Sequence, residues 1–307
     1  MNYLNYFPEG SFCPSLANSY YLESLAHLQE AGPETVLEHF AVSCDAAHNL
    51  HLELPCGNAI IPREECALGI ADGTAKEIAI LSRVGKPICF SVLQADETGI
   101  ILSRRRVQER TRARLLQEVR RGDVLYARAT HIEPFGIFVD IGSGVPSFIG
   151  IENLSVSRIA HPREHFKPGQ ELFTVVTRVD PEANRLYLSH KELLGTWEEN
   201  VSRFHIGETV RGIVRSIEPY GIFVELAPNL SGLADPRPGI ARGDHVSVHI
   251  RNIIPARMKI KLNIIDRIIP RPAVKPYRYY LPDGGHLARW QYSPAACTER
   301  IIETSFE

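Results

Sequence analysis

The sequence predicts a mainly β protein built from tandem copies of one small domain. Residues 132–140, Ile-Glu-Pro-Phe-Gly-Ile-Phe-Val-Asp, return 85 residues later as Ile-Glu-Pro-Tyr-Gly-Ile-Phe-Val-Glu at 217–225. Such a close echo indicates a duplicated module. The register also holds upstream, where Gly-Asp-Val at 122–124 precedes the first copy at the same offset as Gly-Glu-Thr at 207–209 precedes the second. Apolar residues alternate within both copies, which is the pattern of a strand.

Each copy carries two aromatic residues around a glycine, namely Phe135 and Phe138 around Gly136, and Tyr220 and Phe223 around Gly221. Side chains three positions apart point to opposite faces of a flat strand. The glycine permits a bulge or bend that brings both rings to one surface. Paired rings flanked by arginines are what stacking on unpaired bases requires. The alternative for Phe138 and Phe223, which lie between Ile and Val, is a place in the domain core.

The central copy carries further motifs at fixed positions. They are Pro-Phe-Gly-Ile-Phe-Val-Asp at 134–140, His-Pro at 161–162, Lys-Pro-Gly-Gln-Glu at 167–171, Arg-Val-Asp-Pro-Glu at 178–182 and Arg-Leu-Tyr-Leu-Ser at 185–189. With this set the chain resembles the S1 RNA-binding domain family. The resemblance implies a five-stranded OB-type barrel that binds single-stranded RNA. It also implies contacts from two aromatics of the second strand, a His of the third strand, and an Asp and an Arg near the last strand.

Mapped onto this chain, the resemblance assigns the aromatic pair to Phe135 and Phe138, and it finds Gly150 where the third-strand His is expected. Loop 155–163 is expected near the barrel mouth, where this fold holds its ligand. In the later copy Lys259 matches the arginine position and Ile254 replaces the aspartate. The complete set of residues expected to contact RNA is Phe135, Phe138, Arg158, His161, Asp180, Arg185, Arg215, Tyr220, Phe223 and Lys259.

The rest of the chain divides around these copies. The predicted order is an N-terminal extension with a helix (1–33), a divergent S1-like repeat (34–103), a basic linker helix (104–120), the complete repeat (121–192), a short linker helix (193–205), a third repeat (206–266) and a Pro-rich, aromatic and basic C-terminal extension (267–307). In the divergent repeat, His48 and His51 fall where the other copies have aromatics, so we expect few RNA contacts there. Arginines and aromatics of the C-terminal extension suit either stacking on RNA or covering the third barrel, and we favour covering.

Charge is unevenly distributed along the 307 residues. The net charge is −2, but residues 1–103 carry 4 Lys and Arg against 13 Asp and Glu, whereas residues 104–307 carry 30 against 23. This asymmetry predicts different partners for the two parts, with RNA favoured by the basic part. Resemblance to short forms of the bacterial ribosomal protein S1 family implies that mRNA is held near the small ribosomal subunit during translation initiation. The acidic third is then expected to contact small-subunit proteins, in a protein that acts as a monomer.

The sequence contains few features of other classes of protein, such as membrane proteins, metalloproteins or enzymes. No run of 18 apolar residues and no secretory signal pattern occurs, so we expect a cytoplasmic protein without a membrane span. The 6 cysteines are scattered without a Cys-x-x-Cys pair, and neither a metal nor another cofactor is expected. Phosphate-binding glycine loops, nucleophile elbows and zinc-protease motifs are missing, which argues against an enzyme. Two alternatives stay open: an RNA-binding accessory subunit of a ribonuclease or transcription complex, and a protein-interaction scaffold built from OB folds.

Overall fold

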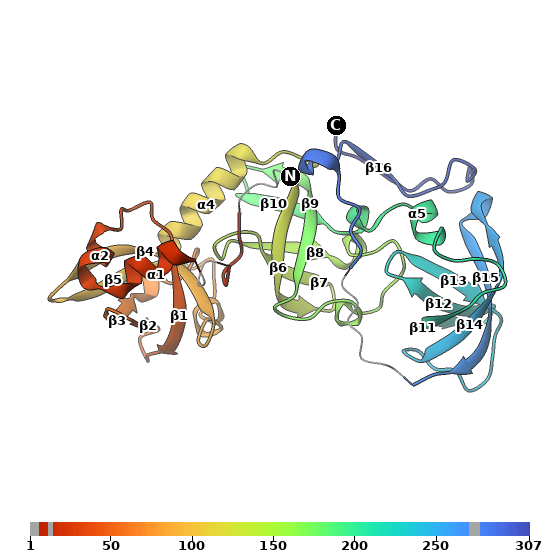
Figure 1. Cartoon of the computed structure of the whole chain (residues 1–307), viewed down its shortest axis with the longest axis horizontal. Helices are drawn as coiled ribbons and strands as arrows, with labels where there is room; N and C mark the ends of the chain where they lie inside the picture. Colours follow the sequence, from red (N-terminus) through yellow and green to blue (C-terminus); the bar gives the residue numbers. More distant parts are fainter. Residues whose placement is uncertain (1–5, 12–14, 270–276) are drawn as a thin grey trace.

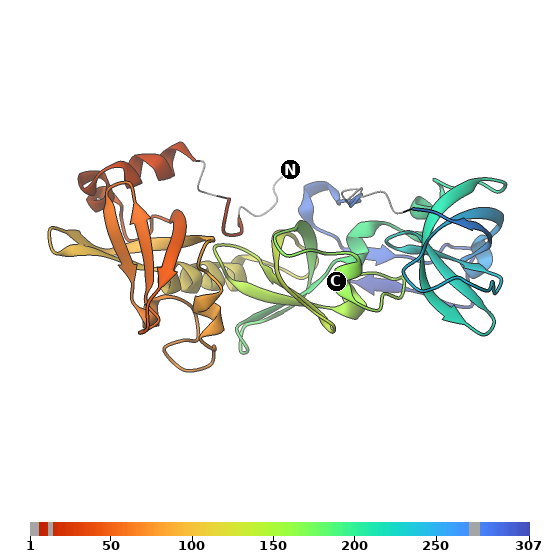
Figure 2. The same ribbon diagram turned by 90° about the horizontal axis from the view of Figure 1, so that it is seen from below.

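The computed structural model describes residues 6–11, 15–269 and 277–307, and these residues form three closed five-stranded barrels. The barrels lie in a row, with the first at one end and the third at the other (Figure 1). The same arrangement is seen in the perpendicular view (Figure 2). The predicted fold class, a mainly β chain of tandem OB-type barrels with helical linkers and an N-terminal helix, is therefore confirmed.

The first barrel closes in the order β1-β2-β3-β5-β4. Its strands are β1 (Leu37–Cys44), β2 (Leu50–Leu54), β3 (Gly57–Ile61), β4 (Pro87–Asp96) and β5 (Gly99–Ser103), with η1 (Arg63–Glu65) and α3 (Ile78–Leu81) between β3 and β4. Helices α1 (Leu16–Glu23) and α2 (Leu25–Glu30) precede the barrel and add Leu22 and Leu28 to its core. The N-terminal helical segment therefore packs on its own domain.

Helix α4 (Arg104–Glu118) connects the first barrel to the central one. Ser103 caps it, since its hydroxyl accepts a hydrogen bond from the Arg106 backbone N–H at 3.0 Å. Arg104 is buried and donates to both carboxylate oxygens of Glu9, at 2.6 and 2.9 Å. The Glu9 backbone N–H in turn donates to Asp140 of the central barrel at 2.7 Å. This buried polar cluster fixes the first barrel against the second.

All three barrels share one topology, in which the third strand pairs in parallel with the fifth. The central barrel consists of β6 (Val124–Glu133), β7 (Gly136–Asp140), β8 (Pro146–Gly150), β9 (Glu171–Asp180) and β10 (Arg185–Ser189), with η2 (Ile151–Asn153), η3 (Pro162–Glu164) and η4 (Lys191–Leu194) beside them. Helix α5 (Trp197–Val201) connects the central barrel to the third. The third barrel consists of β11 (Thr209–Glu218), β12 (Gly221–Ala227), β13 (Leu230–Ala234), β14 (His245–Ile254) and β15 (Lys259–Arg267), with η5 (Pro255–Arg257) between the last two strands.

The C-terminal segment 277–307 crosses both of these barrels (Figure 1). Phe306 packs with Val124 and Val175 of the central barrel, whereas Trp290 and Tyr292 belong to the core of the third. Strand β16 (Arg289–Gln291) follows η6 (Asp283–Gly285) and pairs with β17 (Glu303–Ser305). The extension covers the central barrel as well as the third.

Candidate nucleic-acid interface

One row of cross-strand neighbours crosses the central barrel. Residues directly opposite each other on paired strands point to the same face, with Cβ atoms about 5 Å apart. In this barrel the register pairs successive members from β6 through β7, β8 and β10 to β9, and we call these five residues the central row: His131, Phe138, Phe148, Tyr187 and Arg178. Aromatic rings from three strands and a cation therefore lie side by side on one surface.

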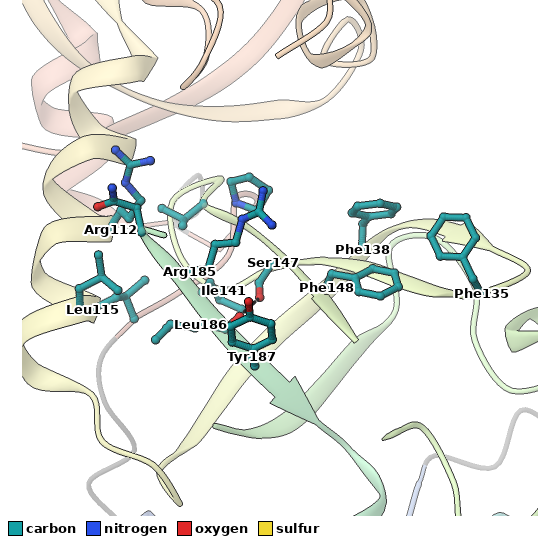
Figure 3. Close-up of a pocket in the computed structure, with 14 residues that line it drawn as sticks. Arg112, Leu115, Phe135, Phe138, Ile141, Ser147, Phe148, Arg185, Leu186 and Tyr187 are labelled. Carbon is teal, nitrogen blue, oxygen red and sulfur yellow. Dashed lines mark hydrogen bonds between the residues drawn. The ribbon is translucent and has the colours of Figure 1, made fainter. Parts of the chain in front are cut away.

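The rings of the central row are partly exposed to solvent. Centroids of Phe138 and Phe148 lie 5.1 Å apart, and Phe135 lies 5.6 Å from Phe148 and 6.5 Å from Phe138 (Figure 3). Phe135 is 57% exposed and Tyr187 is 39% exposed, while Phe138 is half-buried and lies outside the barrel core. The guanidinium carbon of Arg178 lies 4.0 Å from the Tyr187 ring centroid. The geometry thus leaves ring faces available for stacking.

Gly136 is required here by close packing between β7 and β8. A Cβ at this position would collide with the carbonyl oxygen of Ile149 and the ring of Phe148. The register shift of this hairpin lies in β6, between Ala129 and His131, and not at the glycine. Phe135 precedes β7 in the turn, and the turn brings its ring beside Phe138. The predicted shared surface is observed, although the bulge lies on the neighbouring strand.

A groove of about 440 Å³ runs beside the central row, between helix α4 and the barrel. Arg112, Leu115 and Leu116 line it from the helix, and the barrel contributes Arg185 and several ring residues (Figure 3). The structure therefore brings together the predicted residues Phe135, Phe138 and Arg185. Among the aromatic and basic residues that line the groove, the sequence did not predict Arg112, Phe148 and Tyr187. Alternation along β10, with Leu186 and Leu188 buried and Tyr187 exposed, is the signal that could have found Tyr187.

Three other predicted residues take different positions. Asp180 accepts hydrogen bonds from the Arg178 guanidinium at 2.9 Å and from the Ala183 backbone N–H at 3.0 Å, so it orients the cation of the central row. His161 accepts from the Arg163 backbone N–H at 3.1 Å and caps η3, and it lines neither this groove nor the groove described below. Arg158 lies in the second groove, at the junction with the third barrel.

Arg215 has a structural position that differs from its predicted role. Its side chain is only 8% exposed and donates to Glu225 at 2.8 Å and to Glu164 at 3.1 Å. Glu164 belongs to the central barrel, so this ion-pair network joins two barrels. Because both carboxylates already neutralise the guanidinium, we leave Arg215 out of the RNA-binding surface.

The corresponding row is less aromatic in the third barrel and is not aromatic in the first. The third barrel places Phe223 beside Leu233, and Leu233 beside Lys261. Tyr220 is 66% exposed, 6.2 Å from Phe223, and Lys259 pairs with Ile254 as Arg185 pairs with Asp180. In the first barrel the equivalent positions are His51, Ile60 and Ile101. His51 is also paired with Asp45 at 3.1 Å.

Two further kinds of site are missing from the part of the chain that the structure describes. It contains no group of three or more His, Cys, Asp or Glu side chains placed to hold a metal ion. Nor does any helix within it have the length and apolar character needed to span a membrane.

Comparison with known proteins matches the barrel that carries the complete row. Residues 118–191 match the family model of the S1 RNA binding domain. The chain is 29% identical over 188 residues to small ribosomal subunit protein bS1 of Staphylococcus aureus (strain N315), covering 56% of this chain and 48% of the relative. It is 28% identical over 197 residues to bS1 of Rhizobium meliloti (strain 1021), covering 58% and 34%.

Among solved structures, a multidomain protein with nucleic acid binding domains from Streptococcus pneumoniae is 14% identical. The match covers 78% of this chain and 76% of that one, with a TM-score of 0.25. The chain spans about half the length, or less, of the curated relatives described above.

Proposed function

We propose that this protein binds single-stranded RNA by stacking unpaired bases on the central row. The observation that carries the proposal is the continuous set of rings Phe138, Phe148 and Tyr187 on the surface, with Phe135 beside it. Arg185 and Arg112 line the same groove and supply positive charge for backbone phosphates. Every base has a ring face, so this mode of binding is tolerant of sequence and needs no covalent step.

The three barrels differ in their expected contribution. The central barrel offers the full row. The third barrel offers the rings of Tyr220 and Phe223, together with Lys259 and Lys261 of strand β15. Each stacked base contributes about 1–3 kcal/mol. The first barrel has isoleucines in place of two of the row positions, so we expect it to add little to RNA affinity.

The similarity to bS1 supports a more specific role. We propose that the RNA is mRNA, held at the small ribosomal subunit in the cytoplasm by a monomeric chain. The acidic first third would supply the attachment to small-subunit proteins, because ribosomal proteins that bind RNA present basic surfaces. On its β1 strand, Phe40 and Val42 are 49% and 46% exposed and share one face, which favours a protein contact there.

Fluorescence anisotropy with a labelled oligo-uridine of about 12 nucleotides tests the RNA proposal. The double substitution Phe138→Ala with Phe148→Ala removes two rings, so affinity is expected to fall at least about 30-fold, from about 2 kcal/mol of lost stacking. Phe40→Ala, an exposed ring outside the central row, serves as the matched control and should retain wild-type affinity. Equal affinity of the double variant and the control would exclude the central row as the RNA surface. A wild type that fails to bind RNA would favour the protein-scaffold alternative.

A further inference from the structure

A second groove, of about 570 Å³, lies at the junction of the central and third barrels, and we call it the junction groove. Three segments distant in sequence line it. Loop 151–159 of the central barrel contributes Arg158, the third barrel contributes Tyr220 and Phe223, and the C-terminal extension contributes Arg300. The aromatic pair of the third barrel therefore shares a hollow with cations from outside that barrel.

The walls of the junction groove are fixed by contacts that meet at Asn229, which is 1% exposed. Its side chain accepts from the Val156 backbone N–H at 3.0 Å and donates to the Lys191 carbonyl at 2.8 Å. Its own carbonyl oxygen accepts from the Tyr292 hydroxyl. Because the central-barrel loop and the extension both bond to this buried residue of the third barrel, the segments that carry Arg158 and Arg300 are held beside the third barrel by the fold itself.

The two arginines differ from Arg215 in the same groove. Arg215 is buried and paired with Glu164 and Glu225, whereas Arg158 and Arg300 are exposed. Among the described residues, neither of these two exposed guanidinium groups forms an ion pair. Carboxylates of Glu152 and Glu218 also line the groove. An anion held here must therefore lie at the two arginines and away from these glutamates.

We propose that the junction groove binds a stretch of single-stranded RNA, with bases stacked on Tyr220 and Phe223 and backbone phosphates held by Arg158 and Arg300. The inference rests on the proposed function and extends it. The C-terminal extension becomes part of the RNA-binding surface, and RNA affinity of the third barrel depends on its neighbours. The junction groove adjoins the groove beside the central row, because Ile151, which lines the former, donates its backbone N–H to the carbonyl of Phe135, which lines the latter, at 2.9 Å.

Anisotropy measured across a salt series tests this inference, using a labelled oligo-uridine of about 24 nucleotides that reaches two barrels. Each lost phosphate contact lowers the slope of log K against log salt by about 0.7 for a single strand. Arg158→Gln with Arg300→Gln should therefore lower the slope by about 1.4 and the affinity about 25-fold at 0.1 M salt. Glu152→Gln should raise the affinity, because it removes a repulsive charge.

The matched control is Arg203→Gln with Arg211→Gln, two exposed arginines that do not line the junction groove. If the junction double variant and this control change the slope equally, the junction inference is wrong. If the junction inference fails in this way, a loss of RNA binding in the Phe138→Ala with Phe148→Ala variant would still support the proposed function. If the wild type binds no RNA, the proposed function and the inference both fail. Arg300→Gln alone should lower the slope by about 0.7, and an unchanged slope would remove the extension from the RNA surface.

Discussion

His190 gives the fold a specific sensitivity to acid. It is fully buried, with Nδ1 at 3.0 Å from the Leu154 carbonyl and Nε2 at 3.1 Å from the Tyr279 hydroxyl. A neutral ring satisfies both contacts, because Nδ1–H donates to the carbonyl while Nε2 accepts from the tyrosine. Protonation would remove the acceptor that holds Tyr279 of the C-terminal extension. Burial lowers the pKa of His190 from 6.5 to about 4.

The direction and size of the effect follow from this lowered pKa. Above pH 6.5 the ring is neutral in the folded and unfolded chains, so its stabilisation is fully present. As the pH falls from 6.5 toward 4, the unfolded chain binds a proton that the folded chain does not, and stability is lost. The loss is about 2 kcal/mol at pH 5 and approaches about 3.4 kcal/mol below pH 4.

Urea unfolding at pH 7.5 and pH 5.0, followed by circular dichroism and tryptophan fluorescence, measures this loss. Trp197 and Trp290 both pack in the core of the third barrel, and Trp290 reports on the extension. His190→Asn retains a donor for the Leu154 carbonyl but does not titrate. Between pH 7.5 and pH 5.0, the free energy of unfolding of His190→Asn should therefore fall by about 2 kcal/mol less than that of the wild type.

His205→Asn is the matched control, because its side chain is 75% exposed. It should keep the pH dependence of the wild type, because this substitution leaves the buried His190 and its two contacts unchanged. If His190→Asn also keeps the full wild-type dependence, the buried ring does not resist protonation and the reasoning is refuted.

Two further predictions concern the close packing of Gly136 and the buried ion pair of Arg104. Gly136→Ala should lower the stability by about 1–3 kcal/mol and also lower the RNA affinity, because the added Cβ collides with β8. Gly169→Ala is the control, since its Cβ meets nothing within 4 Å, and it should cost only about 1 kcal/mol of backbone strain. Thermal unfolding measures the stability of both variants, and anisotropy measures their RNA affinity. Arg104→Met should cost about 3–5 kcal/mol in urea unfolding, because it removes both short hydrogen bonds of the buried Glu9 carboxylate and leaves only the more distant guanidinium of Arg83, at 3.6 Å. Adding Glu9→Gln should restore part of the loss, and no recovery would contradict the pairing.

Local sequence was sufficient to predict the repeated barrels. The echo between 132–140 and 217–225 has the same register at the structural level, since Phe138 and Phe223 occupy equivalent positions on β7 and β12. His51 of the first barrel occupies that position too, which agrees with the expectation of few RNA contacts there. These features could be predicted because strand alternation and turn glycines are recognised from a few consecutive residues.

Positions set by contacts between distant strands were not predictable in this way. Phe148 and Tyr187 become neighbours of Phe138 only through the pairing of β8 with β7 and β10. Arg215 is an ordinary arginine in its local sequence, and its neutralisation depends on Glu225 of the next strand and on Glu164, 51 residues away in the chain. The local sequence therefore predicts an RNA contact for Arg215 without showing that its charge is already paired.

The extension shows the same limit. Pro-Asp-Gly-Gly at 282–285 is a plausible local hairpin turn between the aromatic segments 277–281 and 286–292. The observed pairing instead joins β16 with β17, which begins at Glu303. Residues 277–281 turn to the central barrel, where Tyr279 meets His190. Competition between barrel surfaces and local pairing decides this outcome, and one sequence does not reveal it.

Ultraviolet cross-linking of the wild-type protein to oligo-uridine, with mass-spectrometric mapping of the linked peptides, tests the central claim most directly. The RNA-stacking account predicts cross-links concentrated at Phe138, Phe148 and Tyr187, with a second group at Tyr220 and Phe223. Cross-links confined to the first barrel, or spread over surfaces away from these rings, would contradict it.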